Sequence, residues 1–156
     1  MQERAHKADK GAARAFKLED HLFFYFSQIL ARRTRAINAR LRPYRLDYSR
    51  WRVLAVLQEH PGATMGRLAD LTSVDRTTLT RTLGLMEKAG LVTRRERESD
   101  RRSLTISLTA KGRRIFARIL PLTLTETDRA LTGFSSEEIG TLRDRLKRMA
   151  DNLRVS

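Results

Sequence analysis

The sequence of 156 residues contains no cysteine, three prolines and three histidines, and only 6% of its residues are aromatic. The absence of cysteine excludes disulfide bonds and thiolate catalysis. His6, His21 and His60 do not have the spacing of a metal site, and neither a phosphate-binding glycine loop nor a nucleophile elbow is present. The sequence therefore gives no support to an enzyme, and we expect no catalytic residue, no metal and no cofactor.

Long apolar runs are also missing. The longest run covers residues 22–26, which is far short of a membrane span, and the first residues lack the apolar segment of a signal peptide. We therefore expect a cytoplasmic protein with no membrane partner. Residues 1–16 have mixed charge and very few large apolar side chains that could be buried, so they are predicted to form a flexible basic arm.

Acidic residues are scarce relative to basic ones. The chain has 32 lysines and arginines against 18 acidic residues, a net charge of +14, and such an excess attracts a polyanion without specifying a fold. Residues 31–52 and 75–118 carry a net charge of +7 each, whereas residues 119–156 are neutral. This division predicts that the two basic windows face DNA and that the last third is free to associate with a second copy.

The most informative pattern begins at Asp75. This residue is a good N-cap, and Leu79, Leu83 and Met86 follow at helical spacing on one face. Threonines and arginines occupy the other faces of this helix, and Gly90 supplies its end. The pattern predicts an amphipathic helix whose polar face can enter a major groove.

A basic hairpin is predicted directly after this helix. Its strands are expected at residues 91–97 and 104–108, with Leu104, Ile106 and Leu108 facing inward, and its charged tip at residues 98–103. A hairpin with arginines at its tip can reach a neighbouring minor groove. Helix and hairpin together predict a winged helix-turn-helix.

These residues resemble a known family. Asp100-Arg101-Arg102 followed by Leu108-Thr109-Ala110-Lys111-Gly112 resembles the wing signature of MarR-type transcriptional regulators. Asp75-Arg76 with Leu85, Met86, Glu87, Gly90, Leu91 and Val92 resembles their recognition helix and its exit. The resemblance extends in order over about residues 18–153. Some members sense peroxide through cysteine, which this chain cannot do because it has none.

The resemblance implies a mainly α fold with a small β-hairpin wing and with dimerisation helices at both ends of the chain. The winged helix-turn-helix is expected at about residues 47–110, and the dimerisation helices at about residues 18–41 and 110–154. Residues 17–156 would form a single domain, and the protein would act as a homodimer.

Capping patterns place the remaining helices. Ser49, Thr64, Thr109 and Ser135 are predicted N-caps, the last with Glu138 in a capping box. The first helix is expected to run from Leu18 to about Leu41 and to stop before Pro43, and the second to end at residues 60–62. Pro121 is expected to bend the fifth helix. Six helices and a wing are therefore predicted.

The expected macromolecular partner is double-stranded DNA with a pseudo-palindromic operator. The predicted DNA-binding residues are Thr72, Ser73, Arg76, Thr77, Thr78, Arg81, Arg101, Arg102 and Ser103. The arginines of the helix would contact phosphate or guanine, and its threonines phosphate or a thymine methyl group. Arg102 is expected to enter the minor groove, and Asp100 to orient the wing by pairing with a neighbouring arginine. The alternative for the helix is an ordinary solvated polar face.

A second set of residues points to a small-molecule effector. In the resembled family, small aromatic acids, phenols or their thioesters bind in a crevice between the dimerisation helices and the winged lobe. This implies an effector site at His21, Phe24, Tyr25, Arg45 and Trp51, where His21 and Tyr25 are four residues apart and share a helix face. The alternative for the aromatic residues is core and dimer packing.

The resulting hypothesis is a sequence-specific regulator, a repressor that a small aromatic ligand releases from DNA. The alternative is a ligand-independent architectural or RNA-binding winged-helix protein.

Overall fold

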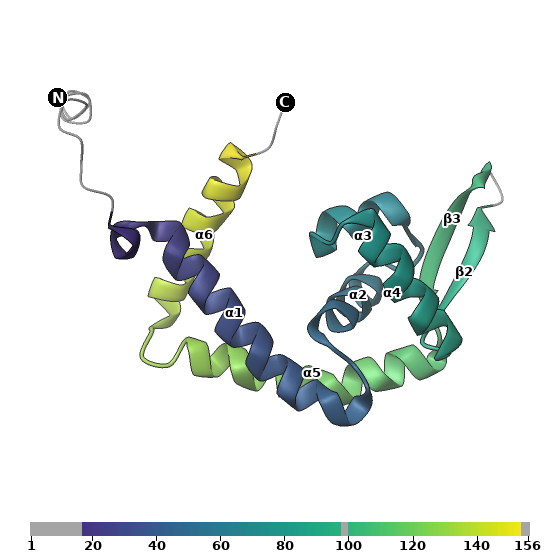
Figure 1. Cartoon of the computed structure of the whole chain (residues 1–156), viewed down its shortest axis with the longest axis horizontal. Coiled ribbons are helices and arrows are strands. Elements are labelled where there is room, and N and C mark those ends of the chain that lie inside the picture. The colour runs from purple at the N-terminus through teal and green to yellow at the C-terminus, as the bar shows by residue number, and fades with distance from the viewer. Residues whose placement is uncertain (1–16, 98–99, 154–156) are drawn as a thin grey trace. The chain divides into compact units, whose positions relative to one another are not determined.

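The computed structural model of the protein describes residues 17–97 and 100–153, with the backbone alone at residues 97 and 100–103. The described residues form six α-helices and a three-stranded antiparallel sheet, which confirms the predicted fold class (Figure 1). The helices are α1 (Leu22–Leu41), α2 (Tyr48–Glu59), α3 (Met65–Thr72), α4 (Arg76–Lys88), α5 (Ala110–Ala130) and α6 (Ser136–Asn152). The strands are β1 (Ala63–Thr64), β2 (Val92–Arg97) and β3 (Asp100–Leu108). The predicted arm at residues 1–16 lies outside the described residues.

The contacts divide the chain into two units, with the boundary after Arg32, inside α1. The described part of the first unit begins with a 3-10 turn at Leu18–Asp20, so the helix that we predicted from Leu18 begins only at Leu22. His21 separates the two segments in an extended conformation, with φ −88° and ψ 120°. The prediction that His21 lies on a helix face is therefore wrong.

The core of the second unit lies around α2. Trp51 stacks on Phe116 of α5, with ring centroids 5.3 Å apart and an angle of 5° between the ring planes. The buried apolar core consists of Ile37, Leu41, Leu46, Trp51, Val53, Leu54, Leu57, Ala63, Leu68, Leu79, Leu83, Met86, Leu91, Val92, Ile106, Leu108 and Ile119. Members of this core come from every α-helix of the unit except α6. The shared core therefore holds α4 and the sheet in fixed positions relative to each other.

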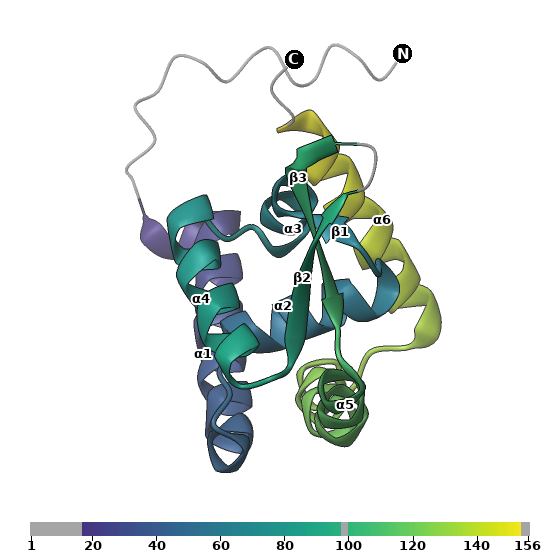
Figure 2. The same ribbon diagram turned by 90° about the vertical axis from the view of Figure 1, so that its right-hand side faces the viewer.

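The sheet has the strand order β1-β3-β2 (Figure 2). β1 was not predicted, because a strand of two residues carries no periodic signal. β3 begins at Asp100, so residues 100–103 belong to a strand and not to the predicted tip. Ile106 and Leu108 are buried as predicted, but Leu104 is 44% exposed because it lies beyond the part of the ribbon that the helices cover.

Most of the predicted helix ends are confirmed. Thr64, Thr109 and Ser135 accept hydrogen bonds from backbone N–H groups in the first turns of α3, α5 and α6, and Ser135 and Glu138 form the capping box. The cap of α2 was predicted wrongly: Asp47, not Ser49, accepts from Arg50 N, at 2.8 Å. The backbone of Asp47 is extended, as a capping residue requires.

The last two helices differ in how many of their residues are buried. α5 contacts α2 and β3 and continues through Pro121, with Ile119, Thr123 and Glu126 buried. α6 has no buried residue, and an apolar groove of about 510 Å³ runs along it, lined by Leu131, Ile139, Leu142, Leu146 and Ala150, with Arg143 and Lys147. No helix in the described part of the chain is long and apolar enough to cross a membrane.

Candidate nucleic-acid interface

Helix α4 has one buried and one exposed face, as the sequence predicted. Leu79, Leu83 and Met86 are at most 1% exposed and hold the helix on the core. Asp75 caps the helix by accepting from Thr78 N at 2.9 Å. Hydrogen bonds from the backbone N–H and the hydroxyl of Thr78 lower the pKa of Asp75, so the cap is charged at neutral pH. The capped helix is therefore firmly oriented on the lobe.

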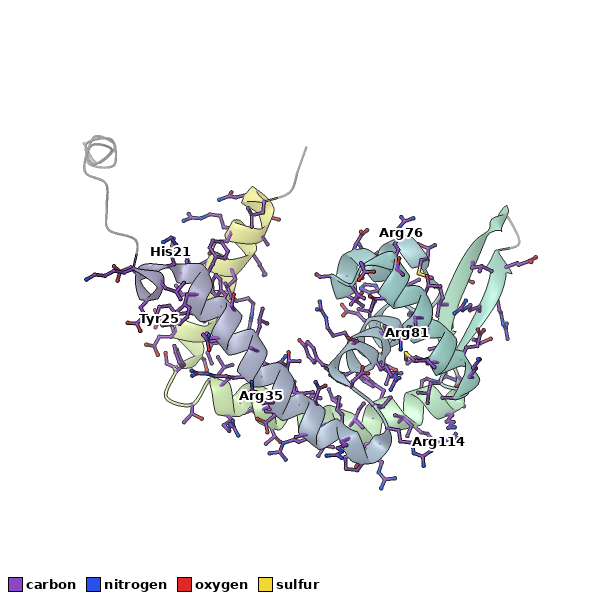
Figure 3. The ribbon with its side chains drawn as sticks, in the orientation of Figure 1. His21, Tyr25, Arg35, Arg76, Arg81 and Arg114 are labelled. Atoms are coloured by element: carbon purple, nitrogen blue, oxygen red, sulfur yellow. The ribbon has the colours of Figure 1, made fainter. Side chains whose placement is uncertain are left out.

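The exposed face of α4 carries Arg76, Thr77, Thr78 and Arg81 (Figure 3). The terminal nitrogen of Arg76 lies 3.8 Å from the position that a Cβ atom on Gly66 would occupy, so Arg76 reaches back across α3. The side chain of Arg81 has no hydrogen bond or ion pair with any of the described residues. The face thus offers guanidinium and hydroxyl groups to an anionic partner.

The turn that leads into α4 contains two predicted DNA contacts, Thr72 and Ser73, and these two side chains differ in their exposure. Ser73 is exposed and adopts the left-handed conformation, with φ 50°. Thr72 is completely buried, and its hydroxyl donates to Leu68 O at 2.6 Å. Because Thr72 is the last residue of α3 and its side chain faces the core, the expectation that it contacts DNA is wrong.

The wing is the ribbon of β2 and β3, which extends from the lobe in Figure 1. The backbone of Arg97 pairs with Asp100, and the register shifts after Glu96. The side chains of Asp100, Arg101, Arg102 and Ser103 lie outside the described residues. Their predicted roles in groove contact and wing orientation therefore remain predictions.

The base of the wing is tied to α4 by Arg94, which the sequence had suggested only as part of a basic strand. Arg94 is 24% exposed, and its Nε lies 3.3 Å from Oε2 of Glu87, without the geometry of a hydrogen bond. Its terminal nitrogen passes 3.9 Å from the place of a Cβ atom on Gly84. No local sequence signal connects β2 with α4 in this way. Arg94 positions the wing and is not a free phosphate ligand.

Half of the arginines in residues 31–52 form contacts inside the protomer, although the charge of this window predicted that it faces DNA. Arg33 donates to the hydroxyl groups of Tyr48 and Thr127, at 3.1 and 3.0 Å. Arg40 pairs with the buried Glu126. The remaining two of this half are Arg50, which pairs with Asp47 and donates to Arg45 O, and Arg52, which stacks over Tyr48.

Glu126 is the only buried acidic side chain among the described residues, at 4% exposure. The hydrogen bond from Arg40 lowers its pKa, and the charge of Arg129 adds to this effect. A charged carboxylate is tolerated there because both partners are cationic. The pair connects the end of α1 with α5 inside the second unit.

The predicted effector residues belong to both units. In the first unit, Phe24 and Tyr25 form an edge-to-face contact with centroids 5.3 Å apart, and Tyr25 is 49% exposed. In the second unit, Arg45 is exposed, but Trp51 is a core residue in contact with Phe116. The alternative of core packing therefore applies to Trp51. The structure describes each unit by itself, so a crevice formed by both remains a prediction.

A helix-turn-helix with a β-ribbon wing defines the class of winged-helix proteins, and comparisons with known proteins agree. A profile of the MarR family matches residues 46–103. The organic hydroperoxide resistance transcriptional regulator of Bacillus subtilis (strain 168) is 34% identical over 96 residues, which are 62% of this chain and 65% of that protein, just under two thirds of its length.

Two further proteins extend the comparison. The HTH-type transcriptional regulator YybA of Bacillus subtilis (strain 168) is 30% identical over 110 residues, which cover 69% of this chain and 73% of that protein. The solved structure of the transcriptional repressor CouR bound to a 23-mer DNA duplex is 26% identical with a TM-score of 0.77, covering 89% of this chain and 99% of that one. The chain belongs to the MarR family of winged helix-turn-helix transcriptional regulators.

Proposed function

We propose that the protein is a repressor that binds a pseudo-palindromic operator in double-stranded DNA as a homodimer. The observation that carries the proposal is the exposed face of α4, where Arg76, Thr77, Thr78 and Arg81 stand opposite a fully buried apolar face. A helix held in this way can enter the major groove with its polar side chains toward the bases. The repressor CouR, bound to DNA in its solved structure, supports the same mode of binding here.

The residues of the interface have different roles in this proposal. Arg76 and Arg81 contact phosphate or guanine, whereas Thr77 and Thr78 contact phosphate or a thymine methyl group. Ser73, at the exposed turn before α4, contacts phosphate. In the wing, Arg101, Arg102 and Ser103 reach the minor groove, with Arg102 inserted and Asp100 orienting the ribbon.

Dimerisation is proposed because the last third of the chain leaves apolar side chains uncovered. Leu124 and Phe134 are each 50% exposed, and Leu142 and Leu146 are 40% and 39% exposed. This region also has no net charge, so two copies would not repel each other. Stable dimers of this kind bury about 2,000 Å² or more.

A small aromatic or phenolic ligand, or its thioester, is proposed to release the repressor from DNA. The aromatic pair of the half-buried Phe24 and the exposed Tyr25, with His21 nearby in the sequence, supports an aromatic binding surface on the first unit. Such a ligand must bind the DNA-incompetent arrangement more tightly than the competent one. We place the protein in the cytoplasm, because a repressor works where the DNA is.

The test is an operator titration with matched variants, after the operator has been selected from random duplexes. Arg102→Ala should weaken binding by about 1 to 3 kcal/mol on every operator variant, whereas Thr78→Ala should change the ranking of variants. Arg114→Ala is the control, because it removes one positive charge from an exposed position on α5, away from Arg76 and Arg81 (Figure 3).

Two results would contradict the proposal. One is equal loss of affinity in the Arg102 and Arg114 variants, which would indicate attraction by net charge alone. The other is equal or tighter binding of RNA hairpins, which would favour the architectural or RNA-binding alternative.

A further inference from the structure

Helix α4 ends in a tight glycine turn. Gly90 has a φ of 69°, and its N–H donates to Glu87 O at 2.8 Å. The N–H of Leu91 donates to Met86 O at 2.9 Å. These two bonds form a Schellman motif, in which a left-handed glycine closes a helix. The carbonyl groups of residues 89–91 lie beyond the last of these acceptors, so they need donors from another segment.

The beginning of α5 supplies these donors. Lys111 Nζ donates to Ala89 O at 2.7 Å. The hydroxyl of Thr109 donates to Gly90 O at 2.6 Å, and the N–H of Thr109 donates to Leu91 O at 3.0 Å. Thr109 and Lys111 belong to the part of the wing signature that follows β3, so this part of the signature joins α4 to α5.

The bond from Lys111 differs from the other two because its donor is charged. The carbonyl groups at the carboxy-terminal end of a helix carry partial negative charge, which a cation stabilises. A hydrogen bond from an ionised donor is also stronger than one between neutral groups. Lys111 is exposed, and it forms no ion pair with any residue in the described part of the chain. Its charge therefore acts mainly on the end of α4.

Helix α5 continues from this contact through the second unit. Phe116 stacks on Trp51 of α2, one turn after Lys111. Further along α5, Glu126 is buried and pairs with Arg40 near the end of α1. The end of α4 is therefore bonded to a helix that is itself held by α2 and by the end of α1.

We propose that Lys111 is a positioning residue for operator recognition, which holds the end of α4 on α5 and thereby fixes the half-site spacing that the dimer accepts. The inference rests on the proposed function, because two half-sites are bound together only if each α4 is held at a fixed place relative to the dimer contact. Helix α5 also carries Leu124, one of the exposed side chains proposed for that contact. Lys111 acts through α4 and not through a bond of its own to DNA.

The alternative role for an exposed lysine is a direct contact with a DNA phosphate, and the two roles have different consequences. Loss of a phosphate contact weakens binding to all duplexes uniformly and lowers the slope of log affinity against log salt concentration by about one. Loss of a positioning contact leaves this slope unchanged and lets α4 shift, so the preference for one spacing decreases. Loss of folded protein lowers the affinity for every operator by the same factor.

The test compares the full-length protein with its Lys111→Met variant, in which the side chain keeps its apolar part and loses the charged donor. The operators have their original half-site spacing or a spacing changed by one base pair. The unaltered protein should prefer the original spacing by about tenfold or more, because one base pair rotates the second half-site by about a tenth of a turn. Lys111→Met should bind the original operator about three- to tenfold more weakly, with a preference of about threefold or less and the same salt slope.

Arg114→Met is the matched control. Arg114 is an exposed cation on the same helix, and its side chain has no hydrogen bond to α4 within the described residues (Figure 3). This variant should keep the spacing preference of the unaltered protein. An unchanged preference in the Lys111 variant, or a salt slope that falls by about one, would overturn the proposal.

Hydrogen exchange without DNA separates this proposal from the proposed function. In Lys111→Met, the amides of Ala89, Gly90 and Leu91, which close the end of α4, should exchange about threefold faster or more, whereas those of α6 should not change. Equal exchange rates would refute the role of Lys111 at the end of α4, whatever the DNA titrations give. If exchange is faster but no variant binds any duplex specifically, the proposed function fails, and the role of Lys111 in operator spacing fails with it.

Discussion

Substitution of Gly112 by alanine should destabilise the winged lobe. Gly112 is buried in the first turn of α5, where a Cβ atom would lie 2.1 Å from Leu91 O and 3.1 Å from Leu91 C. Leu91 O cannot move away freely, since it accepts a hydrogen bond from Thr109 N at 3.0 Å. The structure thus explains the glycine that ends the wing signature: the start of α5 packs directly on the backbone before β2.

The magnitude follows from three contributions. The added carbon must gain more than 1 Å of separation to reach ordinary contact, and forced overpacking of this kind costs about 1 to 3 kcal/mol. Losing the Thr109 to Leu91 hydrogen bond costs about 0.5 to 1.5 kcal/mol more. Alanine returns up to about 1 kcal/mol through its higher helix propensity. At the central values of these contributions, the net loss in the free energy of unfolding is about 2.5 kcal/mol.

The measurement is urea and thermal unfolding, followed by circular dichroism and Trp51 fluorescence at one fixed protein concentration. For a chain of this length the loss corresponds to a drop in Tm of roughly 5 to 10 °C. Gly84→Ala is the control, because its Cβ atom would meet only Arg94, at an ordinary 3.9 Å, and should stabilise by up to about 1 kcal/mol. Equal stabilities of the two variants would refute the packing argument.

Three further predictions concern the dimer, the effector and acid stability. Deletion of residues 135–156 should abolish the dimer and with it tight binding to half-sites spaced about 10 bp apart; a truncated protein that light scattering finds dimeric and that binds as tightly as the full chain would contradict this. Tyr25→Phe and His21→Ala should reduce the release of operator DNA by aromatic acids or phenols more than they reduce operator affinity, with a wild-type coupling of about 1 to 3 kcal/mol; a panel of such compounds that releases no DNA would remove the basis for the effector site. Finally, because hydrogen bonds from Thr78 lower the pKa of Asp75 below 3.8, its stabilising contribution is complete above that pH and is lost as the pH falls through the lowered pKa; Asp75→Asn should therefore flatten the acid limb of the free energy of unfolding against pH, and an unchanged limb would exclude Asp75 as its source.

The parts of the fold that the sequence predicts correctly are those set by neighbours along the chain. The inner face of α4 follows from the spacing of Leu79, Leu83 and Met86, and the caps at Thr64, Thr109 and Ser135 follow from one side chain and one N–H group three residues later. Such signals need no tertiary information. The polar face of α4 could be predicted for the same reason.

Apart from the local errors at the start of α1 and at the cap of α2, the errors concern contacts between distant segments. A two-residue strand such as β1 exists only because β3 pairs with it, and Thr72 looks like an ordinary polar turn residue until the core covers it. The contact of Arg94 with Glu87 and Gly84 joins a strand to a helix, so no periodic pattern in the sequence could predict it. Likewise, a surface cavity between residues 44–50, 85–91 and 111–115 forms only when three segments that are far apart in the sequence come together.

Helix α4 has several contacts with the wing and with α5. Arg94 of β2 lies against its outer side at Gly84 and pairs with Glu87, and Lys111 of α5 donates to Ala89 O at its carboxy-terminal end. Wing, helix and α5 are thereby coupled at a single junction. Groove and phosphate contacts demand a fixed spacing between helix and wing. In the proposed mode of DNA binding, we therefore expect substitutions at this junction to change operator affinity in a titration although these side chains do not contact DNA.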